Sequence, residues 1–412
     1  MKRLRMAITM LAMWLWVASP AQSVDGVGIR FLDNSPWQEV LTAAQQENKL
    51  IFIDCYTSWC GPCKALAKEV FTRPEVGAFF NDRFINVKYD MEKGDGKMLR
   101  ERYRQHIIGF PTLLLVNAEG KVLQQLAGYQ QPEALIGGIR KAAEGRDLFT
   151  LTREYGQGNR KIGFIKEYIE SLNRAFLRDS AAHVAHDFII RMQPADLDKD
   201  SVWQTVGSYV TDVRSDAFAY LVDNANRYQH KLHRDRLAIN RQVGYACERE
   251  LRSCLNVRPK RGDDGTVLCA DTIWMQRLIH YMEKVNVEGR DRYQSKLYIH
   301  KLLLKGLYDE AWQVLKLCCR MQLSGYYSTT VHDYVCYLME VNKDKRALKA
   351  YLAQLEAMQG DKREYNYHTL ETMARLCQRL GQQKRAEVLM REFKQIDEEK
   401  RKEIDSFLKR EK

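Results

Sequence analysis

The stretch Trp59-Cys60-Gly61-Pro62-Cys63-Lys64 decides how the first part of this 412-residue chain is interpreted. Two residues separate the cysteines, which follow an apolar strand-like run and precede an amphipathic helix-like run. A cysteine at a helix N-terminus faces unpaired backbone N–H groups and the positive end of the helix dipole, which favour its nucleophilic thiolate. The second cysteine, one helical turn later, is near enough to close a disulfide. The pattern therefore predicts a pair that alternates between dithiol and disulfide without a cofactor.

A Cys-x-x-Cys pair also suits zinc, so a metal site is the first alternative. A structural zinc site needs about four ligands, usually two such pairs or a Cys pair with a His pair. The chain has no second Cys-x-x-Cys. Two His pairs with ligand-like spacing, His183/His186 and His230/His233, lie far along the chain on expected helices. We therefore expect no metal, and solvated or packed histidines at these positions.

Strand and helix patterns alternate around the cysteine pair, from residue 24 to about residue 146. The expected elements are a helix starting at Ser35, a strand over 50–53, helices over 64–71 and from Pro74, a strand over 84–89, a helix over 97–104, strands over 111–116 and 122–127, and a helix over 132–143. The turn Asn117–Gly120 joins the last two strands as a hairpin. This order predicts an α/β fold with a mixed central sheet and helices on both faces.

Residues 59–64 match the active-site signature of the thioredoxin family, and residues 24–146 resemble that family in three further places. Asp54, six residues before Cys60, is similar to the buried acid of the family. Lys88, on the following strand, is similar to the lysine that many members carry near this acid. Pro111, within Gly109-Phe110-Pro111-Thr112, is similar to the cis-proline of the family. The resemblance implies a thioredoxin fold and does not extend to residues 150–412.

The resemblance also implies a role for each of these residues. Cys60 is expected to be the exposed nucleophile, and Cys63 to resolve the mixed disulfide by attacking Cys60. Asp54, supported by Lys88, is expected to lie beneath the pair and take the proton of Cys63 as it attacks. Cys55, next to this acid, is expected to point into the core and to stay outside the cycle.

A substrate-binding rim is implied as well. Trp59 is expected to shield the sulfurs, and Phe110 to pair its main chain with an extended substrate beside a cis Pro111. Gly61 and Pro62 form the interior of the motif, and this Gly-Pro interior resembles the reducing members of the family. We therefore expect a low redox potential, which favours disulfide reduction.

Strand patterns stop after this region, and residues 147–412 predict an all-helical domain. Its last third contains three similar helix–helix turns, Gly306–Ala311, Asn342–Ala347 and Gly381–Ala386. Their alanines are 36 and 39 residues apart, close to the period of helical-hairpin repeats. We expect degenerate tetratricopeptide-like units within 295–400, with an irregular helical bundle as the alternative.

The first 23 residues are typical of an export signal. Basic residues at positions 2, 3 and 5 precede the uncharged run Met6–Ala18, and small residues then allow cleavage after Ala21 or Ser23. The run of 13 residues is shorter than the roughly 20 that span a bilayer, which favours a cleaved signal over an anchor. We expect an exported protein, periplasmic or otherwise extracytoplasmic.

Charge and the remaining cysteines say less about function. The formal net charge is +12, but basic residues alternate with acidic ones and form no block interleaved with aromatics, so we expect no nucleic-acid partner. Eight further cysteines permit structural disulfides. Four of them are expected to be buried thiols (Cys318, Cys319, Cys336 and Cys377). The better disulfide candidates flank an irregular stretch (Cys247, Cys254 and Cys269).

The sequence thus predicts an exported thiol–disulfide oxidoreductase that reduces or exchanges disulfides in extracytoplasmic proteins. Its expected partners are protein disulfide substrates, an extracytoplasmic or membrane electron donor, and a protein bound by the helical domain. Two alternatives stay open. In one, the helical region is a binding scaffold and the thioredoxin-like module only positions it; in the other, the protein is a chaperone with incidental redox activity.

Overall fold

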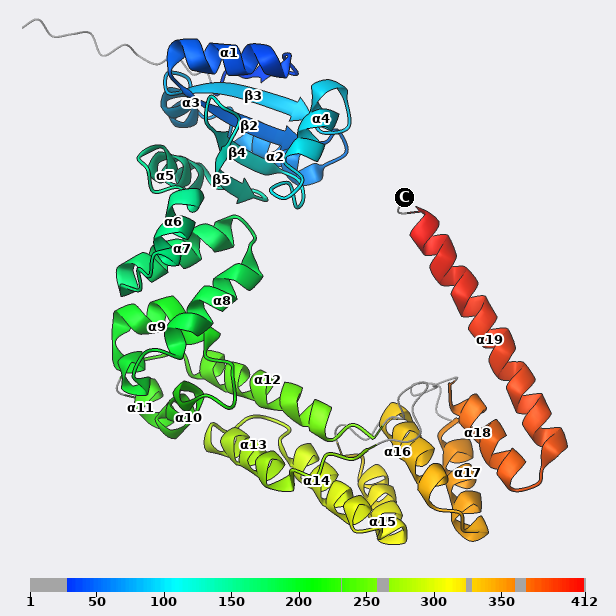
Figure 1. Cartoon of the computed structure of the whole chain (residues 1–412). Helices are drawn as coiled ribbons and strands as arrows, with labels where there is room; N and C mark the ends of the chain where they lie inside the picture. The colour runs from blue at the N-terminus through cyan, green and yellow to red at the C-terminus, as the bar shows by residue number, and fades with distance from the viewer. Residues whose placement is uncertain (1–27, 231, 258–266, 324–327, 360–367, 411–412) are drawn as a thin grey trace, which may run out of the picture. The chain divides into compact units, whose positions relative to one another are not determined.

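The computed structural model describes residues 28–230, 232–257, 267–323, 328–359 and 368–410 (Figure 1). Contacts divide the chain into two compact units, Met1–Phe188 and Ile189–Lys412. The export signal expected at residues 1–23 lies outside the described residues, so it stays a prediction. Within the described residues, no helix combines the length and apolar character needed to cross a membrane.

The first unit is built on a five-stranded sheet with the strand order β1-β3-β2-β4-β5. The strands are β1 (Leu32–Asp33), β2 (Leu50–Tyr56), β3 (Phe84–Asp90), β4 (Thr112–Val116) and β5 (Val122–Ala127). β3 runs parallel to β1 and β2, whereas β4 runs antiparallel to both β2 and β5. The predicted mixed sheet is therefore confirmed. The two-residue edge strand β1 was not predicted, because two residues are too few to show an alternating pattern.

Helices cover both faces of the sheet, as predicted. Helices α1 (Trp37–Glu47) and α4 (Gly94–Arg102) pack on one face, and α2 (Gly61–Glu69), α3 (Pro74–Phe80) and α5 (Pro132–Ala143) pack on the other. Within β2, Ile51, Ile53 and Cys55 join the α1 side, whereas Phe52 joins the α2 side. Because successive side chains of a strand alternate between faces, Asp54 lies on the α2 side.

Three more helices, α6 (Leu148–Gly156), α7 (Ile162–Arg174) and α8 (Arg178–Ile189), follow the sheet, and α6 and α7 pack against β5. Two buried amides of β5 hold them: Gln124 Oε1 accepts a hydrogen bond from the N–H of Leu148 at 2.8 Å, and Gln125 Nε2 donates to the Ala175 carbonyl at 3.1 Å. These helices cover the edge strand β5, which would otherwise be open to pairing. The domain boundary predicted at residue 146 falls between α5 and α6, whereas contacts group α6 and α7 with the sheet.

The second unit is helical across its described residues, which confirms the predicted all-helical region. Its helices are α9 (Asp200–Val206), α10 (Asp216–Asp223), α11 (Ala225–His230), α12 (Arg236–Cys254), α13 (Thr272–Lys284), α14 (Asp291–Leu304), α15 (Tyr308–Arg320), α16 (Ser328–Val341), α17 (Lys345–Gln359), α18 (His368–Arg379) and α19 (Gln383–Arg410), with short 3-10 turns at Pro194–Asp198 and Gly207–Tyr209. The three predicted helix–helix turns lie between α14 and α15, α16 and α17, and α18 and α19. Gly306 and Gly381 end the preceding helices with φ of 73° and 78°, a conformation that favours glycine. The repeat itself stays a prediction.

Candidate active site

Cys60 and Cys63 form a disulfide at the start of α2, with an S–S distance of 2.07 Å and a Cα–Cα distance of 5.3 Å. Cys60 is the N-cap residue, and its Sγ accepts a hydrogen bond from the backbone N–H of Cys63 at 3.1 Å. Pro62 lies in the first turn, where a helix needs no backbone donor. Apart from the two neighbouring residues and the backbone of α2 itself, no described atom lies within 4 Å of where a Cβ of Gly61 would be, so this side of the motif is open. The structure thus brings the two predicted cysteines together, and their individual roles stay predictions.

The sulfurs are less accessible than the sequence suggested. Cys60 is only 3% exposed and Cys63 only 5%, whereas Trp59 is 65% exposed. The expectation that Cys60 is exposed is therefore wrong for the disulfide state. The reason is local: the Cys60 side chain bonds to Cys63 and turns back over the first turn of α2, toward the N–H of that residue.

The rim beside the disulfide is formed by two loops that meet through aromatic rings. Trp59 Nε1 donates a hydrogen bond to Glu92 Oε2 at 3.1 Å, and the Trp59 ring meets Phe110 edge-on with a centroid distance of 6.1 Å. The Phe110–Pro111 peptide bond is cis, as the resemblance implied. The guanidinium carbon of Arg100 lies 5.6 Å from the centroid of Phe110. The sequence pointed to Trp59, Phe110 and Pro111, but no local pattern connected Glu92 or Arg100 with them.

Asp54 is a buried carboxyl on the face of β2 that α2 covers. It is 5% exposed, and its Oδ1 has no hydrogen-bond partner among the described residues. Burial raises the pKa of Asp54 to about 7, and the positive charge of Lys88 opposes part of this rise. Lys88 is the partner of Asp54 in the β2–β3 register, yet its Nζ pairs with Asp33 Oδ2 at 3.3 Å. A carboxyl with this pKa can accept or release a proton near neutral pH.

Cys55 lies in the hydrophobic cluster on the α1 side of the sheet and is 1% exposed, which confirms that it points into the core. Burial raises the pKa of its thiol well above the ordinary value, and the neighbouring Asp54 adds to the rise. A thiol that is buried and protonated is a poor nucleophile, which agrees with the expectation that Cys55 stays outside the cycle; that expectation stays a prediction.

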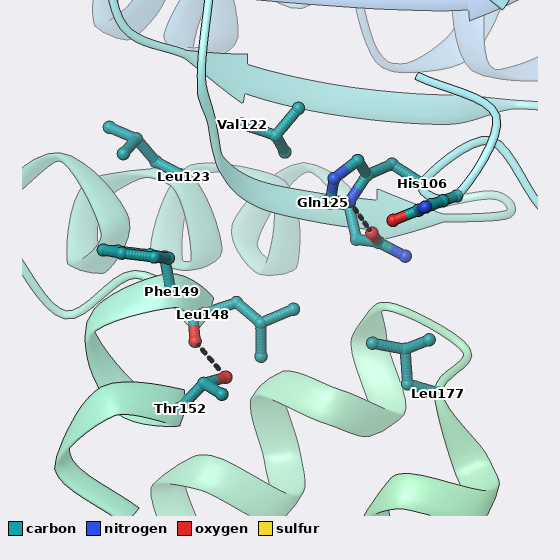
Figure 2. Close-up of a pocket in the computed structure, with 9 residues that line it drawn as sticks. His106, Val122, Leu123, Gln125, Leu148, Phe149, Thr152 and Leu177 are labelled. Carbon is teal, nitrogen blue, oxygen red and sulfur yellow. Dashed lines mark hydrogen bonds between the residues drawn. The ribbon is translucent and has the colours of Figure 1, made fainter. Parts of the chain in front are cut away.

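A separate pocket of about 260 Å³ lies between β5 and α6 (Figure 2). Val122 and Gln125 line it from β5, and Leu148 and Phe149 line it from α6. His106 also faces it, with Nδ1 2.8 Å from Gln125 Oε1. None of the residues that line this pocket is a cysteine or a predicted site residue.

Two His pairs with ligand-like spacing occur in the helical part of the chain. His183 and His186 lie on α8, and His230 is the last residue of α11. In the described part of the chain, no group of three or more His, Cys, Asp or Glu side chains could hold a metal ion.

A mixed sheet, a cysteine pair at a helix N-terminus, a buried carboxyl on the adjoining strand and a cis-proline loop together define the thioredoxin-fold class. Residues 34–118 match the family described as thioredoxin-like. The helical second unit lies outside the matched residues.

Several known proteins are similar to part of the chain. The thiol:disulfide interchange protein DsbD of Vibrio vulnificus (strain YJ016) is 24% identical over 131 residues, which are 31% of this chain and 22% of that protein. The protein disulfide-isomerase of Triticum aestivum is 27% identical over 95 residues, 23% of this chain and 18% of that protein. A solution structure of a candidate disulphide-isomerase from Bacteroides thetaiotaomicron is 41% identical, covers 29% of this chain and 96% of its own, and has a TM-score of 0.27. The chain thus spans about a fifth of the length of the curated relatives that it matches.

Proposed function

We propose that this protein is an exported thiol–disulfide oxidoreductase that reduces or exchanges disulfides in extracytoplasmic proteins. The observation that carries the proposal is the Cys60–Cys63 disulfide at the N-terminus of α2, on the sheet face that holds the buried Asp54. The export signal expected at residues 1–23 supports the location. The similarity to proteins named for disulfide interchange and isomerisation supports the reaction class.

The cycle needs only the two cysteines and the substrate. The reduced Cys60 attacks one sulfur of a substrate disulfide, which forms a mixed disulfide and releases the other substrate sulfur as a thiolate. Cys63 then attacks Cys60, which forms the Cys60–Cys63 disulfide and releases the second substrate sulfur. The substrate gains the two electrons that the cysteine pair loses. An extracytoplasmic or membrane donor must return them.

Asp54 has the properties of a proton acceptor for the second attack. Cys63 must lose its proton to become a nucleophile, because the thiolate and not the thiol attacks. The pKa of about 7 makes the Asp54 carboxylate basic enough to take that proton and acidic enough to release it near neutral pH. Lys88, the cross-strand partner, limits how far the pKa of the carboxyl rises.

The aromatic rim formed by Trp59 and Phe110 is the surface that binds the substrate. The exposed Trp59 offers an apolar surface beside the sulfurs, and its contact with Phe110 joins the loop before α2 to the loop before β4. An extended substrate segment that pairs with the Phe110 main chain would lie across this rim, above the disulfide. The helical second unit supplies a further surface that binds a specific protein partner.

Insulin reduction with dithiothreitol as the electron source tests the proposal. We expect Cys60→Ser to lose the catalysed reaction completely, because no nucleophile remains at the N-cap of α2. Cys319→Ser, which removes a partly exposed thiol of the second unit, is the matched control and should retain wild-type activity. Wild-type turnover in Cys60→Ser would refute the proposed cycle.

A further inference from the structure

The pocket between β5 and α6 has a mostly apolar lining that carries no charge. Its volume of about 260 Å³ corresponds to roughly nine water-sized groups at about 30 Å³ each. The lining consists of five apolar and four polar side chains, all of them in the first unit (Val122, Leu123, Leu148, Phe149 and Leu177; Gln105, His106, Gln125 and Thr152). None of them is a carboxylate, an ammonium or a guanidinium group. Because a charged ligand would lose its water here without meeting an opposite charge in the lining, the pocket favours a neutral ligand.

The hydrogen bonds of Gln125 determine which nitrogen of His106 carries the proton. Gln125 is only 1% exposed, and its Nε2 donates to the carbonyl oxygen of Ala175 at 3.1 Å. A carbonyl oxygen can only accept, so the amide atom that lies 2.8 Å from Nδ1 of His106 must be Oε1. Oε1 also can only accept, so Nδ1 is the donor of this bond. In the neutral ring, the other nitrogen, Nε2, is therefore an acceptor.

This acceptor is available to a ligand. Among residues 28–230, which include every residue that lines the pocket, none forms a hydrogen bond with Nε2 of His106. Figure 2 shows the imidazole ring between Val122 and Gln125, beside the apolar part of the lining. A ligand that fills the pocket and carries one O–H group can donate to this nitrogen.

Phe149 adds an aromatic surface to the pocket. Phe149 is 42% exposed although it is a large apolar side chain, and the ammonium nitrogen of Lys121 lies 3.4 Å from the centroid of its ring. This cation–π contact holds the ring in place at the start of α6. Aromatic rings attract one another in edge-on and offset arrangements, so an aromatic ligand gains a contact here that an aliphatic ligand lacks.

We propose that this pocket binds a small, neutral aromatic molecule that carries one hydroxyl group. The ring of the ligand packs against Phe149 and the apolar side chains, and its hydroxyl group donates a hydrogen bond to Nε2 of His106. p-Cresol has this chemistry and serves as the probe, and toluene is the same molecule without the hydroxyl group. The inference does not depend on the proposed dithiol cycle, because none of the residues that line the pocket takes part in it.

Nitrogen NMR of the histidine rings tests the acceptor directly. The oxidised full chain, labelled with ¹⁵N-histidine, is measured at pH 8, where an ordinary histidine is neutral. The ring signals that disappear in His106→Asn belong to His106. We expect His106 to carry its proton on Nδ1, and we expect p-cresol to shift the Nε2 signal toward that of a hydrogen-bonded nitrogen, whereas toluene should not. A proton on Nε2, or an Nε2 signal that p-cresol leaves unchanged up to its solubility, would overturn the proposal.

Calorimetric titration of matched variants gives a second readout. His106→Asn keeps a donor beside Gln125, because the asparagine amide can take the position of Nδ1, but it removes the acceptor. One hydrogen bond of ordinary net strength corresponds to about fivefold in affinity, so the variant should bind p-cresol about fivefold more weakly than wild type. Its affinity for toluene should change much less. Equal losses for the two probes, or no loss for p-cresol, would contradict the hydrogen bond to His106.

Two further arms test the location of the site and the charge of its ligand. Leu177→Trp fills the pocket and should abolish the binding of both probes; undiminished binding in a variant with the unfolding midpoint of wild type would place the site elsewhere and refute the proposal. 4-Methylbenzoate, which carries a carboxylate in place of the hydroxyl group, should bind wild type at least about tenfold more weakly than p-cresol. An equal affinity for this anion would contradict a site for neutral ligands.

Discussion

Replacing Asp54 with asparagine should remove a specific pH dependence from the stability of the first unit. Asparagine has nearly the same shape but cannot ionise. Burial raises the pKa of Asp54 to about 7 in the folded protein, against 3.8 for an ordinary aspartate. Between these values the folded state holds a proton that the unfolded state has lost, so the free energy of unfolding falls as the pH rises. About three pKa units at about 1.36 kcal/mol each correspond to a loss of about 4 kcal/mol.

Urea unfolding of the oxidised full chain measures this effect, with hydrogen exchange of β2 and β3 peptides to isolate the first unit. The stability of Asp54→Asn relative to wild type should rise by about 4 kcal/mol between about pH 4 and pH 8. Asp33→Asn is the matched control, because it removes an exposed carboxyl beside the same Lys88. Its difference from wild type should stay nearly flat. An Asp54→Asn difference that is equally flat over this range would refute the raised pKa and with it the proposed proton acceptor.

Three further predictions test the fold and the rim. Leu113→Ala should lower the unfolding free energy of the first unit by about 2–5 kcal/mol in urea, because Leu113 is fully buried on the α2 side of the sheet. The control Leu113→Met should lower it by less than about 1.5 kcal/mol. Equal losses in the two variants would contradict the described packing of Leu113. Asp147→Ala should lower the unfolding free energy by about 0.5–2 kcal/mol in the same assay, because Asp147 Oδ1 caps α6 by accepting a hydrogen bond from the N–H of Thr150 at 2.9 Å. Asp147→Asn should retain most of that stability. An alanine variant as stable as the wild type would argue against the cap. Trp59→Ala should change the unfolding free energy by less than about 1 kcal/mol, because the Trp59 side chain is mostly exposed. The same variant should have a lower kcat/KM for insulin reduction. An unchanged kcat/KM would exclude Trp59 from the substrate-binding rim.

The features that the sequence predicted well are those set by local patterns. The apolar run over residues 50–53 was enough to predict the strand β2, whereas the packing in the structure shows that Phe52 faces α2 and that Ile51 and Ile53 face α1. The cysteine pair was predictable because a strand pattern ended just before it and a helix pattern began at it. The cis bond before Pro111 came from the family resemblance, since no local pattern distinguishes a cis from a trans proline.

The features that the sequence did not predict depend on contacts between distant segments. Gln124 and Gln125 are polar residues in a strand pattern, and nothing near them shows that α6 and α7 bury their amides. The hydrogen bond from Trp59 to Glu92 joins segments 33 residues apart. Cys60 is buried in the disulfide state, and the sequence of the motif does not indicate which redox state the pair adopts.

Trapping with Cys63→Ser tests the proposed dithiol cycle most directly. In this variant Cys60 can still attack a substrate disulfide, but no second cysteine can release the product. We predict that the reduced variant forms a mixed disulfide with disulfide-bonded insulin. Mass spectrometry should locate this adduct on Cys60, and dithiothreitol should cleave it. The Cys60→Ser/Cys63→Ser variant should give none. An adduct of equal abundance in both variants, or no adduct on Cys60, would contradict the cycle.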